Sequence, residues 1–264
     1  MRKSIAIILC FFACASSALA TPTDDQDFIT AMINGGHFQQ QHRYRDALRW
    51  YEQALRLKPD SWAPYQNAGA MLIQLDDFQG AINILTRGTK VEPKRPEFYC
   101  LLSEAHVGLG DPKGALADLN QAIVLQPNCE AYYAKRAEAY EGLGEHDKAI
   151  QDYSKAIRLF APVKTTPTAP ANPSDKGMYR LVSERGTVYE RTGKFQNAID
   201  DYTTYLCAPR QYQANSLRIL QSRAECYDKI GKHDLAAKDR AAAANHKGDV
   251  LEDLLNDETI GTGR

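Results

Sequence analysis

The sequence carries almost no excess of charge of either sign. It has 32 lysine and arginine residues against 33 aspartate and glutamate residues, so its formal net charge is −1 at pH 7. A surface that binds nucleic acid concentrates positive charge to neutralise phosphates. The balance therefore gives no electrostatic reason to expect nucleic acid among the partners.

Motifs of known catalytic sites are missing as well. The sequence has no Gly-x-Ser-x-Gly turn, no glycine-rich phosphate loop and no His-Glu-x-x-His pair. The six histidines are scattered, and we interpret His106, His146 and His233 as packing residues. We therefore expect no catalytic residue, no cofactor and no metal site, which makes an enzyme or a small-ligand binder the least favoured class.

Long apolar runs are absent after the first 20 residues. Before that point, a basic start at residues 1–3 precedes an apolar run at 5–13 and small residues at 18 and 20. This order is typical of a cleaved signal peptide and is too short for a permanent membrane span. A lipoprotein signal acylated at Cys14 is less favoured, because two phenylalanines precede it. We expect an exported protein, periplasmic or secreted, without a stable transmembrane anchor.

The strongest pattern in the chain is a repeated alanine. Four alanines are spaced 34 residues apart and two more continue the series: Ala47, Ala81, Ala115, Ala149, Ala198 and Ala236. A fixed period of this length is typical of stacked supersecondary units. Counting each unit from 19 residues before its alanine gives six units, which start at residues 28, 62, 96, 130, 179 and 217.

Other positions of the unit repeat with the alanine at position 20. Position 8 is always small: Gly35, Gly69, Ser103, Ala137, Gly186 and Ala224. Positions 11 and 24 are mostly large and apolar or aromatic. Residues spaced by three, four and seven share one face of a helix. The spacing therefore predicts two antiparallel helices per unit, which approach closely at their small residues.

This pattern resembles the tetratricopeptide repeat, and the resemblance covers about residues 28–246. It implies an all-α fold, a right-handed α-solenoid of about six helix-turn-helix repeats, with a non-catalytic role in protein–protein interaction. Tyr205 and Arg240 depart from the small and aromatic positions of the last two units. We expect the least regular packing there.

The repeats and their interruptions divide the chain. We expect a cleaved signal peptide at 1–20, a short N-terminal segment at 21–27, units one to four at 28–161, an inserted proline-rich loop at 162–176, units five and six at 177–247, and a capping helix with a tail at 248–264. A cap would cover the open end of the stack. The loop is either a tolerated insertion or a segment that contacts a partner.

Four cysteines remain after the expected signal peptide: Cys100, Cys129, Cys207 and Cys226. Four cysteines allow three pairings. A bridge between Cys100 and Cys129 is the most plausible pairing, because both should lie near the starts of neighbouring first helices. Unpaired cysteines that act as small apolar side chains are the alternative.

The resemblance also implies a binding surface. In the family, positions 2, 5, 6, 9 and 12 of the first helices line a concave groove. The groove residues implied here are Ile29, Met32, Gln66, Asn67, Glu97, Glu104, Lys135, Glu138, Glu141, Glu184, Glu190 and Glu225. Their order favours a partner segment with an apolar end and a basic end, although ordinary solvated helix faces would give the same composition.

The sequence leaves three classes of function, in order of preference. The first is a scaffold or adaptor that binds a protein segment in the groove in an exported compartment. The second is a structural subunit of a cell-envelope assembly that self-associates through its repeat faces. A small-ligand binder or an enzyme is a distant third.

Overall fold

The computed structural model describes residues 22–160, 175–208 and 215–245, and these residues form helices joined by short turns, without a strand among them. The helices are α1 (Pro22–Gln40), α2 (Tyr44–Leu57), α3 (Trp62–Gln74), α4 (Phe78–Val91), α5 (Pro96–Gly108), α6 (Pro112–Leu125), α7 (Glu130–Gly142), α8 (His146–Phe160), α9 (Asp175–Arg191), α10 (Phe195–Leu206) and α11 (Ser216–Lys229). Residues 233–245 are helical too. Consecutive helices pack in pairs, and each pair packs on the next.

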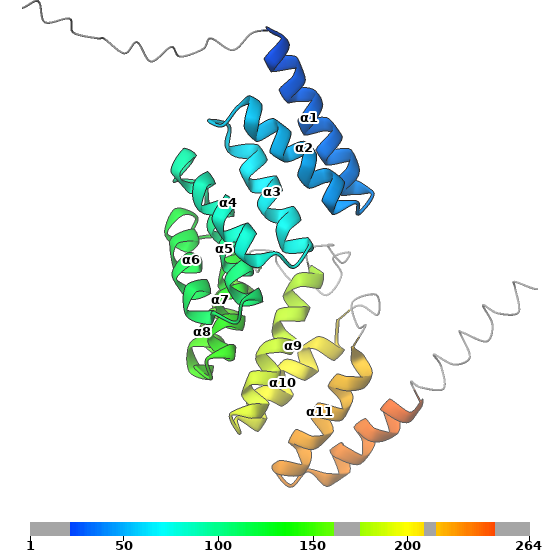
Figure 1. Cartoon of the computed structure of the whole chain (residues 1–264). Coiled ribbons are helices and arrows are strands. Elements are labelled where there is room, and N and C mark those ends of the chain that lie inside the picture. Colours follow the sequence, from blue (N-terminus) through cyan, green and yellow to red (C-terminus); the bar gives the residue numbers. More distant parts are fainter. Residues whose placement is uncertain (1–21, 161–174, 209–214, 246–264) are drawn as a thin grey trace, which may run out of the picture.

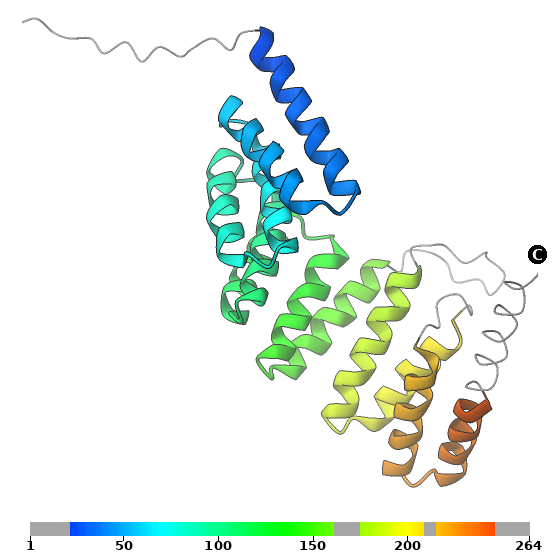
Figure 2. The same ribbon diagram turned by 45° about the vertical axis from the view of Figure 1, so that its right-hand side comes forward.

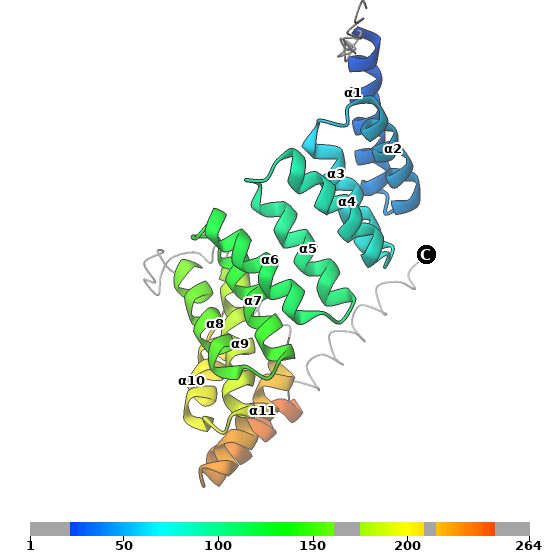
Figure 3. The ribbon, with the colours of Figure 1, turned by 60° about the vertical axis from the view of Figure 1, so that its left-hand side comes forward.

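The pairs follow one another along a curved array, with α4, α6 and α8 at its left-hand edge (Figure 1). Figure 2 shows the first and last pairs at opposite ends of the array, and Figure 3 shows the pairs α3/α4, α5/α6 and α7/α8 in succession. The predicted all-α solenoid of helix-turn-helix repeats is confirmed.

Several predicted segments fall outside the described residues: the signal peptide at 1–20, most of the loop at 162–176 and the capping helix at 248–264. At the N-terminus, α1 begins at Pro22, inside the segment predicted to precede the first unit. Among the described residues, no helix combines the length and the apolar character that crossing a membrane requires.

The two helices of each unit meet at the alanine of position 20. All six alanines, from Ala47 to Ala236, are 0% exposed. Small residues of the first helix lie close to a large side chain of the second. A Cβ on Gly35 would stand 2.5 Å from the Tyr51 ring, and one on Gly69 would stand 2.4 Å from the Leu85 side chain. The helix pairs are therefore packed too closely for larger side chains at these positions.

Every unit turns between its two helices through the same backbone conformation. The residue at position 15 has a positive φ of 58–75° in all six units: His42, Asp76, Gly110, Gly144, Gly193 and Gly231. Glycine adopts this conformation without strain, and aspartate and histidine adopt it more readily than most residues do. A common turn gives each helix pair the same geometry.

Units four to six share a buried ion pair that the first two units lack. An arginine at position 7 donates two hydrogen bonds of 2.7–2.9 Å to an aspartate at position 23: Arg136–Asp152, Arg185–Asp201 and Arg223–Asp239. The remaining Nη1 donates to the second helix of the preceding unit, at Asn120, Ser154 and Thr203 respectively. Unit two has Ala68 and Ile84 at these positions, so its packing there is apolar.

The contact between units four and five is kept although 15 more residues than usual separate their alanines. Besides the hydrogen bond from Arg185 to Ser154, Lys194 Nζ lies 2.7 Å from Asp147 Oδ1, and Arg191 pairs with Glu141. Helices α8 and α9 pack directly on one another. The stacking therefore continues across the insertion.

The states of the cysteines and histidines can be compared with the expectations from the sequence. Cys100, Cys129, Cys207 and Cys226 are all free thiols. Burial raises the pKa of Cys226 to about 12, which keeps its thiol protonated and unreactive. His106 is packed and hydrogen-bonded to Asp118, as predicted. The prediction for His233 is wrong: its side chain is 74% exposed and lies beside Asp228, because no neighbouring unit covers this turn among the described residues.

Replacing Ala115 with leucine should lower the free energy of unfolding by about 1–3 kcal/mol, because the extra side chain has no space between α5 and α6. The matched control is Ala117→Leu on the same helix, where the alanine is exposed. This control should change stability by less than about 0.5 kcal/mol. Urea unfolding followed by circular dichroism measures both, and equal effects would contradict the packing account.

The pair Arg185–Asp201 should behave as a coupled unit. Arg185→Leu and Asp201→Ile each leave one charged partner buried and should cost about 3–5 kcal/mol. The double variant takes the leucine of position 7 in unit three and the isoleucine of position 23 in unit two, and should lose less than the sum of the single variants. The same unfolding measurement tests this, and simple additivity would show that the two residues do not stabilise one another.

Candidate functional site

The first helices form the inner layer of the array. Helix α3 contacts α5 directly although α4 lies between them in sequence, as expected on the shorter side of a curve. In most units a side chain of the second helix is hydrogen-bonded to a residue of the first helix in this layer. Tyr51, Tyr153 and Tyr202 at position 24 donate hydrogen bonds of 2.6–2.8 Å to position 12, at Gln39, Glu141 and Glu190 respectively. Arg240 and Asp228 make the equivalent contact in unit six.

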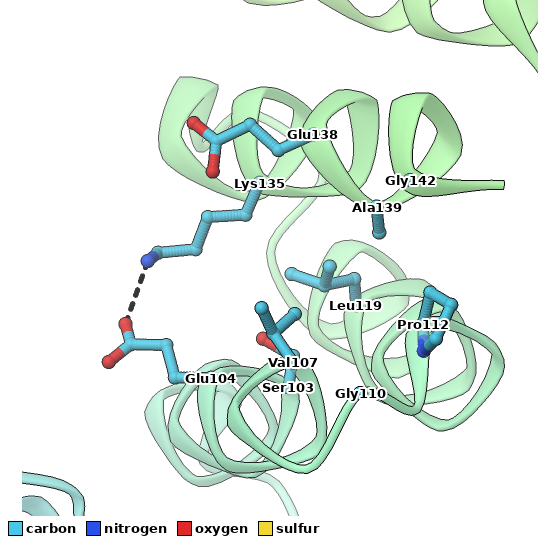
Figure 4. A pocket seen from close by; sticks show the side chains of 10 residues that line it. All are labelled: Ser103, Glu104, Val107, Gly110, Pro112, Leu119, Lys135, Glu138, Ala139 and Gly142. Carbon is cyan, nitrogen blue, oxygen red and sulfur yellow. Dashed lines mark ion pairs between the residues drawn. The ribbon is translucent and has the colours of Figure 1, made fainter. Parts of the chain in front are cut away.

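Unit three lacks this link, and a hollow lies beside it. Leu119 stands at position 24 and Val107 at position 12, so neither side chain can make the hydrogen bond. A cavity of about 480 Å³ opens between α5, α6 and α7 at this point (Figure 4). We call it the α5–α7 hollow. Its apolar floor is formed by Leu119, Ala139 and Val107, and Val107 is 57% exposed.

Charged side chains stand at one side of the α5–α7 hollow. Lys135 extends from α7 toward Glu104 on α5, and its Nζ lies 2.7 Å from Glu104 Oε1 (Figure 4). Burial alone would lower the pKa of Lys135, but the hydrogen bond and charge of Glu104 outweigh it and raise this pKa. Glu138 lies next to Lys135, and its nearest cation is Arg180 at 3.6 Å. This side therefore keeps a partly uncompensated carboxylate.

A second, smaller hollow lies toward the N-terminus. It encloses about 270 Å³ between α1, α2, α3 and α5, and we call it the α1–α5 hollow. Met71, Ile73 and Leu101 give it an apolar lining, with Gln39 at its edge. Glu104 lines both hollows, so they follow one another along α5.

The acidic residues predicted for the later groove are partly neutralised. Arg180 Nη1 lies 2.6 Å from Glu184 as well as 3.6 Å from Glu138, and Arg191 pairs with Glu141. Burial raises the pKa of Glu184; the charge of Arg180 opposes this effect, and the charge of Glu138 adds to it. These contacts leave less free negative charge than the sequence suggests.

Other predicted groove residues lie outside both hollows. Gln66 accepts a hydrogen bond of 3.0 Å from Arg95, which also lies 3.6 Å from Glu97. Met32 packs against the apolar core, Asn67 is half-buried, and Ile29 and Glu225 are exposed. Glu190 accepts from Tyr202, as described above. The structure thus brings three of the predicted residues together at one hollow, namely Glu104, Lys135 and Glu138.

The apolar floor of the α5–α7 hollow was not among the predicted site residues. Leu119 and Ala139 read as ordinary core residues in the sequence, whereas Val107 occupies position 12, which the family resemblance assigns to the groove. The signal that points to them is the leucine at position 24 of unit three, where three other units carry tyrosine.

The lining of the α5–α7 hollow combines apolar and charged side chains with a single hydroxyl. Ser103, the one hydroxyl among the lining residues of the α5–α7 hollow, donates a 2.6 Å hydrogen bond to the Cys100 carbonyl. Within the described part of the chain, no three histidine, cysteine, aspartate or glutamate residues gather where they could hold a metal ion.

Replacing Glu184 with glutamine should change how stability depends on pH. The pKa of Glu184 is raised in the folded protein above its ordinary value of 4.5, so the unfolded chain releases this proton first as pH rises. The native protein therefore loses stability as pH rises above this ordinary value, and Glu184→Gln should gain stability relative to it over the same change in pH. Urea unfolding at several pH values measures the difference. Glu52→Gln, an exposed control, should show no such trend, and a trend of opposite sign for Glu184→Gln would refute the assignment.

Comparisons with known proteins agree with this architecture. Two models described as tetratricopeptide repeat match residues 38–105 and 100–163. No curated protein matches the chain by sequence.

Solved structures share the fold at low sequence identity. PilF of Pseudomonas aeruginosa is 12% identical, with a TM-score of 0.64 over 82% of this chain and 90% of that chain. A tetratricopeptide repeat protein from Parabacteroides merdae is 16% identical, with a TM-score of 0.62 over 83% and 80%. MamA from Desulfovibrio magneticus is 18% identical, with a TM-score of 0.57 over 68% and 93%. The repeat models over residues 38–163 identify the chain as a tetratricopeptide repeat protein, and the solved structures share its fold of stacked helix pairs.

Proposed function

We propose that this protein is a non-catalytic scaffold that binds a segment of another protein along the inner layer of its first helices, in an exported compartment. The observation that carries the proposal is the pair of hollows that share Glu104. Together they offer apolar floors beside charged side chains on rigid helices. Peptide-binding grooves commonly combine these features, because apolar pockets give affinity and placed charges give orientation.

The charge distribution supports a segment with a basic part. Near the α5–α7 hollow, Lys135 is paired with Glu104, whereas Glu138 has only a 3.6 Å contact with Arg180, which lies closer to Glu184. A cation on the partner would complete this arrangement. The exported location rests on the N-terminal sequence alone, where the pattern is that of a signal peptide.

The partner can be trapped at the site with a photo-crosslinking amino acid. We place it at Val107 in the α5–α7 hollow and, as a matched control, at Val124, an equally sized and 74% exposed residue of α6 outside both hollows. Irradiation in the envelope fraction of the source organism should yield an adduct with another protein from position 107 and not from position 124. Equal labelling from both positions would contradict a binding surface on the inner layer.

A partner identified in this way allows a quantitative test. The double variant Glu104→Lys and Glu138→Lys should weaken binding about tenfold or more at low salt, because it reverses two charges of the surface. It should also reduce the dependence of affinity on salt. The control is Glu52→Lys with Asp200→Lys, which reverses two exposed carboxylates of the second helices α2 and α10. Unchanged affinity in the first variant would reject the proposal.

Self-association is separated from capture of a different protein by light scattering. A scaffold for another protein should keep one molar mass over a hundredfold range of protein concentration. A mass that rises with concentration, together with a crosslink from position 107 to a second copy of this chain, would instead identify a self-associating structural subunit.

A further inference from the structure

The side chain at position 24 differs between unit four and unit three. In unit four, Tyr153 fills this position; it is almost fully buried, and its hydroxyl donates to Glu141 at 2.7 Å. In unit three, the same position holds Leu119, which ends short of position 12. The α5–α7 hollow lies where the phenol ring and its hydrogen bond are missing.

Unit two also carries a leucine at position 24. A Cβ added to Gly69 would stand 2.4 Å from Leu85, so this leucine fills the space above the glycine. Unit three has Ser103 at position 8, and Ser103 is itself part of the lining of the α5–α7 hollow. The α1–α5 hollow occupies the equivalent place beside unit one, where Tyr51 donates to Gln39, and at about 270 Å³ it is smaller than the α5–α7 hollow.

The lining of this space selects an apolar side chain. Leu119, Val107 and Ala139 form its floor, and Gly110 and Gly142 leave one side free of side chains. A volume of about 480 Å³ is within the range of pockets that hold ligands. Val107 remains 57% exposed in the protein alone, so covering it would remove apolar surface from water.

The charges beside the hollow select a basic neighbour for that side chain. Glu104 is matched by Lys135 at 2.7 Å. Glu138 has a 50% exposed side chain and only a 3.6 Å contact with Arg180, which lies closer to Glu184. A lysine or arginine bound at Glu138 would meet a half-exposed carboxylate whose compensation is incomplete.

We propose that the α5–α7 hollow is the anchor pocket of the scaffold. It takes one large apolar side chain of a partner peptide, such as leucine, methionine or phenylalanine, while a lysine or arginine near it in the peptide pairs with Glu138. This inference deepens the proposed function and depends on it, since it names the part of the surface and the peptide chemistry that give affinity.

The test fills the pocket with residues that other units carry at the equivalent positions. The triple variant combines Ser103→Ala, Val107→Gln and Leu119→Tyr. The alanine is the residue of position 8 in unit four, and the glutamine is the acceptor at position 12 of unit one. The tyrosine stands at position 24 in both of those units. The new phenol should occupy the space and donate to the new glutamine, as Tyr51 does to Gln39. Circular dichroism and thermal unfolding verify that this pocket-filled variant is folded.

The probes are ten-residue peptides selected from a randomised display library against the protein from residue 21 onward. Selected sequences should share a large apolar residue with a lysine or arginine within about three residues. Labelled synthetic copies are then titrated by fluorescence polarisation. Substituting the apolar residue with alanine should weaken binding about tenfold or more. The pocket-filled variant should lose a similar factor and become insensitive to that alanine substitution.

Glu138→Gln should weaken the same peptides about threefold and should abolish the effect of replacing their basic residue with glutamine. Val124→Gln on α6 and Glu52→Gln on α2 are the matched controls, and both should leave affinity unchanged. Peptides that bind the pocket-filled variant as tightly as the original protein would overturn the anchor pocket. If photo-crosslinks from Ile73 still place those peptides in the α1–α5 hollow, the scaffold function itself stands. A library that yields no selected sequence would count against both.

Discussion

The structure depends on the contact between two helix backbones at the alanine of position 20. Because that side chain ends at Cβ, the second helix lies close enough to place position 24 against positions 8 and 12 of the first helix. The residue at position 24 then contributes to the inner surface. A tyrosine such as Tyr153 places a ring and a hydrogen bond there, and Leu119 lines the α5–α7 hollow. A buried packing contact in this way shapes the inner surface.

The units hold to one another by two different physical means. Around α2 to α5 the contacts are apolar, in a continuous cluster that includes Leu85 and Phe98. From unit four onward, arginines such as Arg185 reach an aspartate of their own unit and a hydroxyl of the preceding one. Apolar contacts tolerate small shifts of one helix against another, whereas a bidentate arginine–aspartate pair with a third hydrogen bond fixes the relative orientation of the helices that it joins. The second half of the array is therefore held in a more defined register than composition alone suggests.

Much of the fold could be predicted from the sequence, because the alanine period reports a local geometry that every unit repeats. Departures from the period were harder to interpret. Tyr205 stands at a position expected to be small, yet it is 3% exposed and its hydroxyl accepts a hydrogen bond from the Asn215 backbone. Its accommodation depends on the residues that follow α10, which no repeat pattern describes.

The candidate site was predictable only in part, for a related reason. Position in the repeat indicated Glu104, Lys135 and Glu138, since these residues lie on predictable faces of their helices. The ion pair between Glu104 and Lys135 joins two units, and the hollow is bounded by three helices of units three and four. The distance between residues of two units and the volume of a hollow both depend on how the units stack. A single sequence does not report this stacking.

The join between units four and five has a consequence for how the chain tolerates changes in length. These units are connected by the polypeptide and, independently, by side-chain contacts such as Arg185 with Ser154 and Lys194 with Asp147. The entropic cost of a longer connection grows only slowly with its length. Residues can therefore be added to or removed from the insertion at little cost in stability while the same helix faces continue to meet. Tolerance to a change of length lies in the connection, and the contacts on either side of it maintain the stacking.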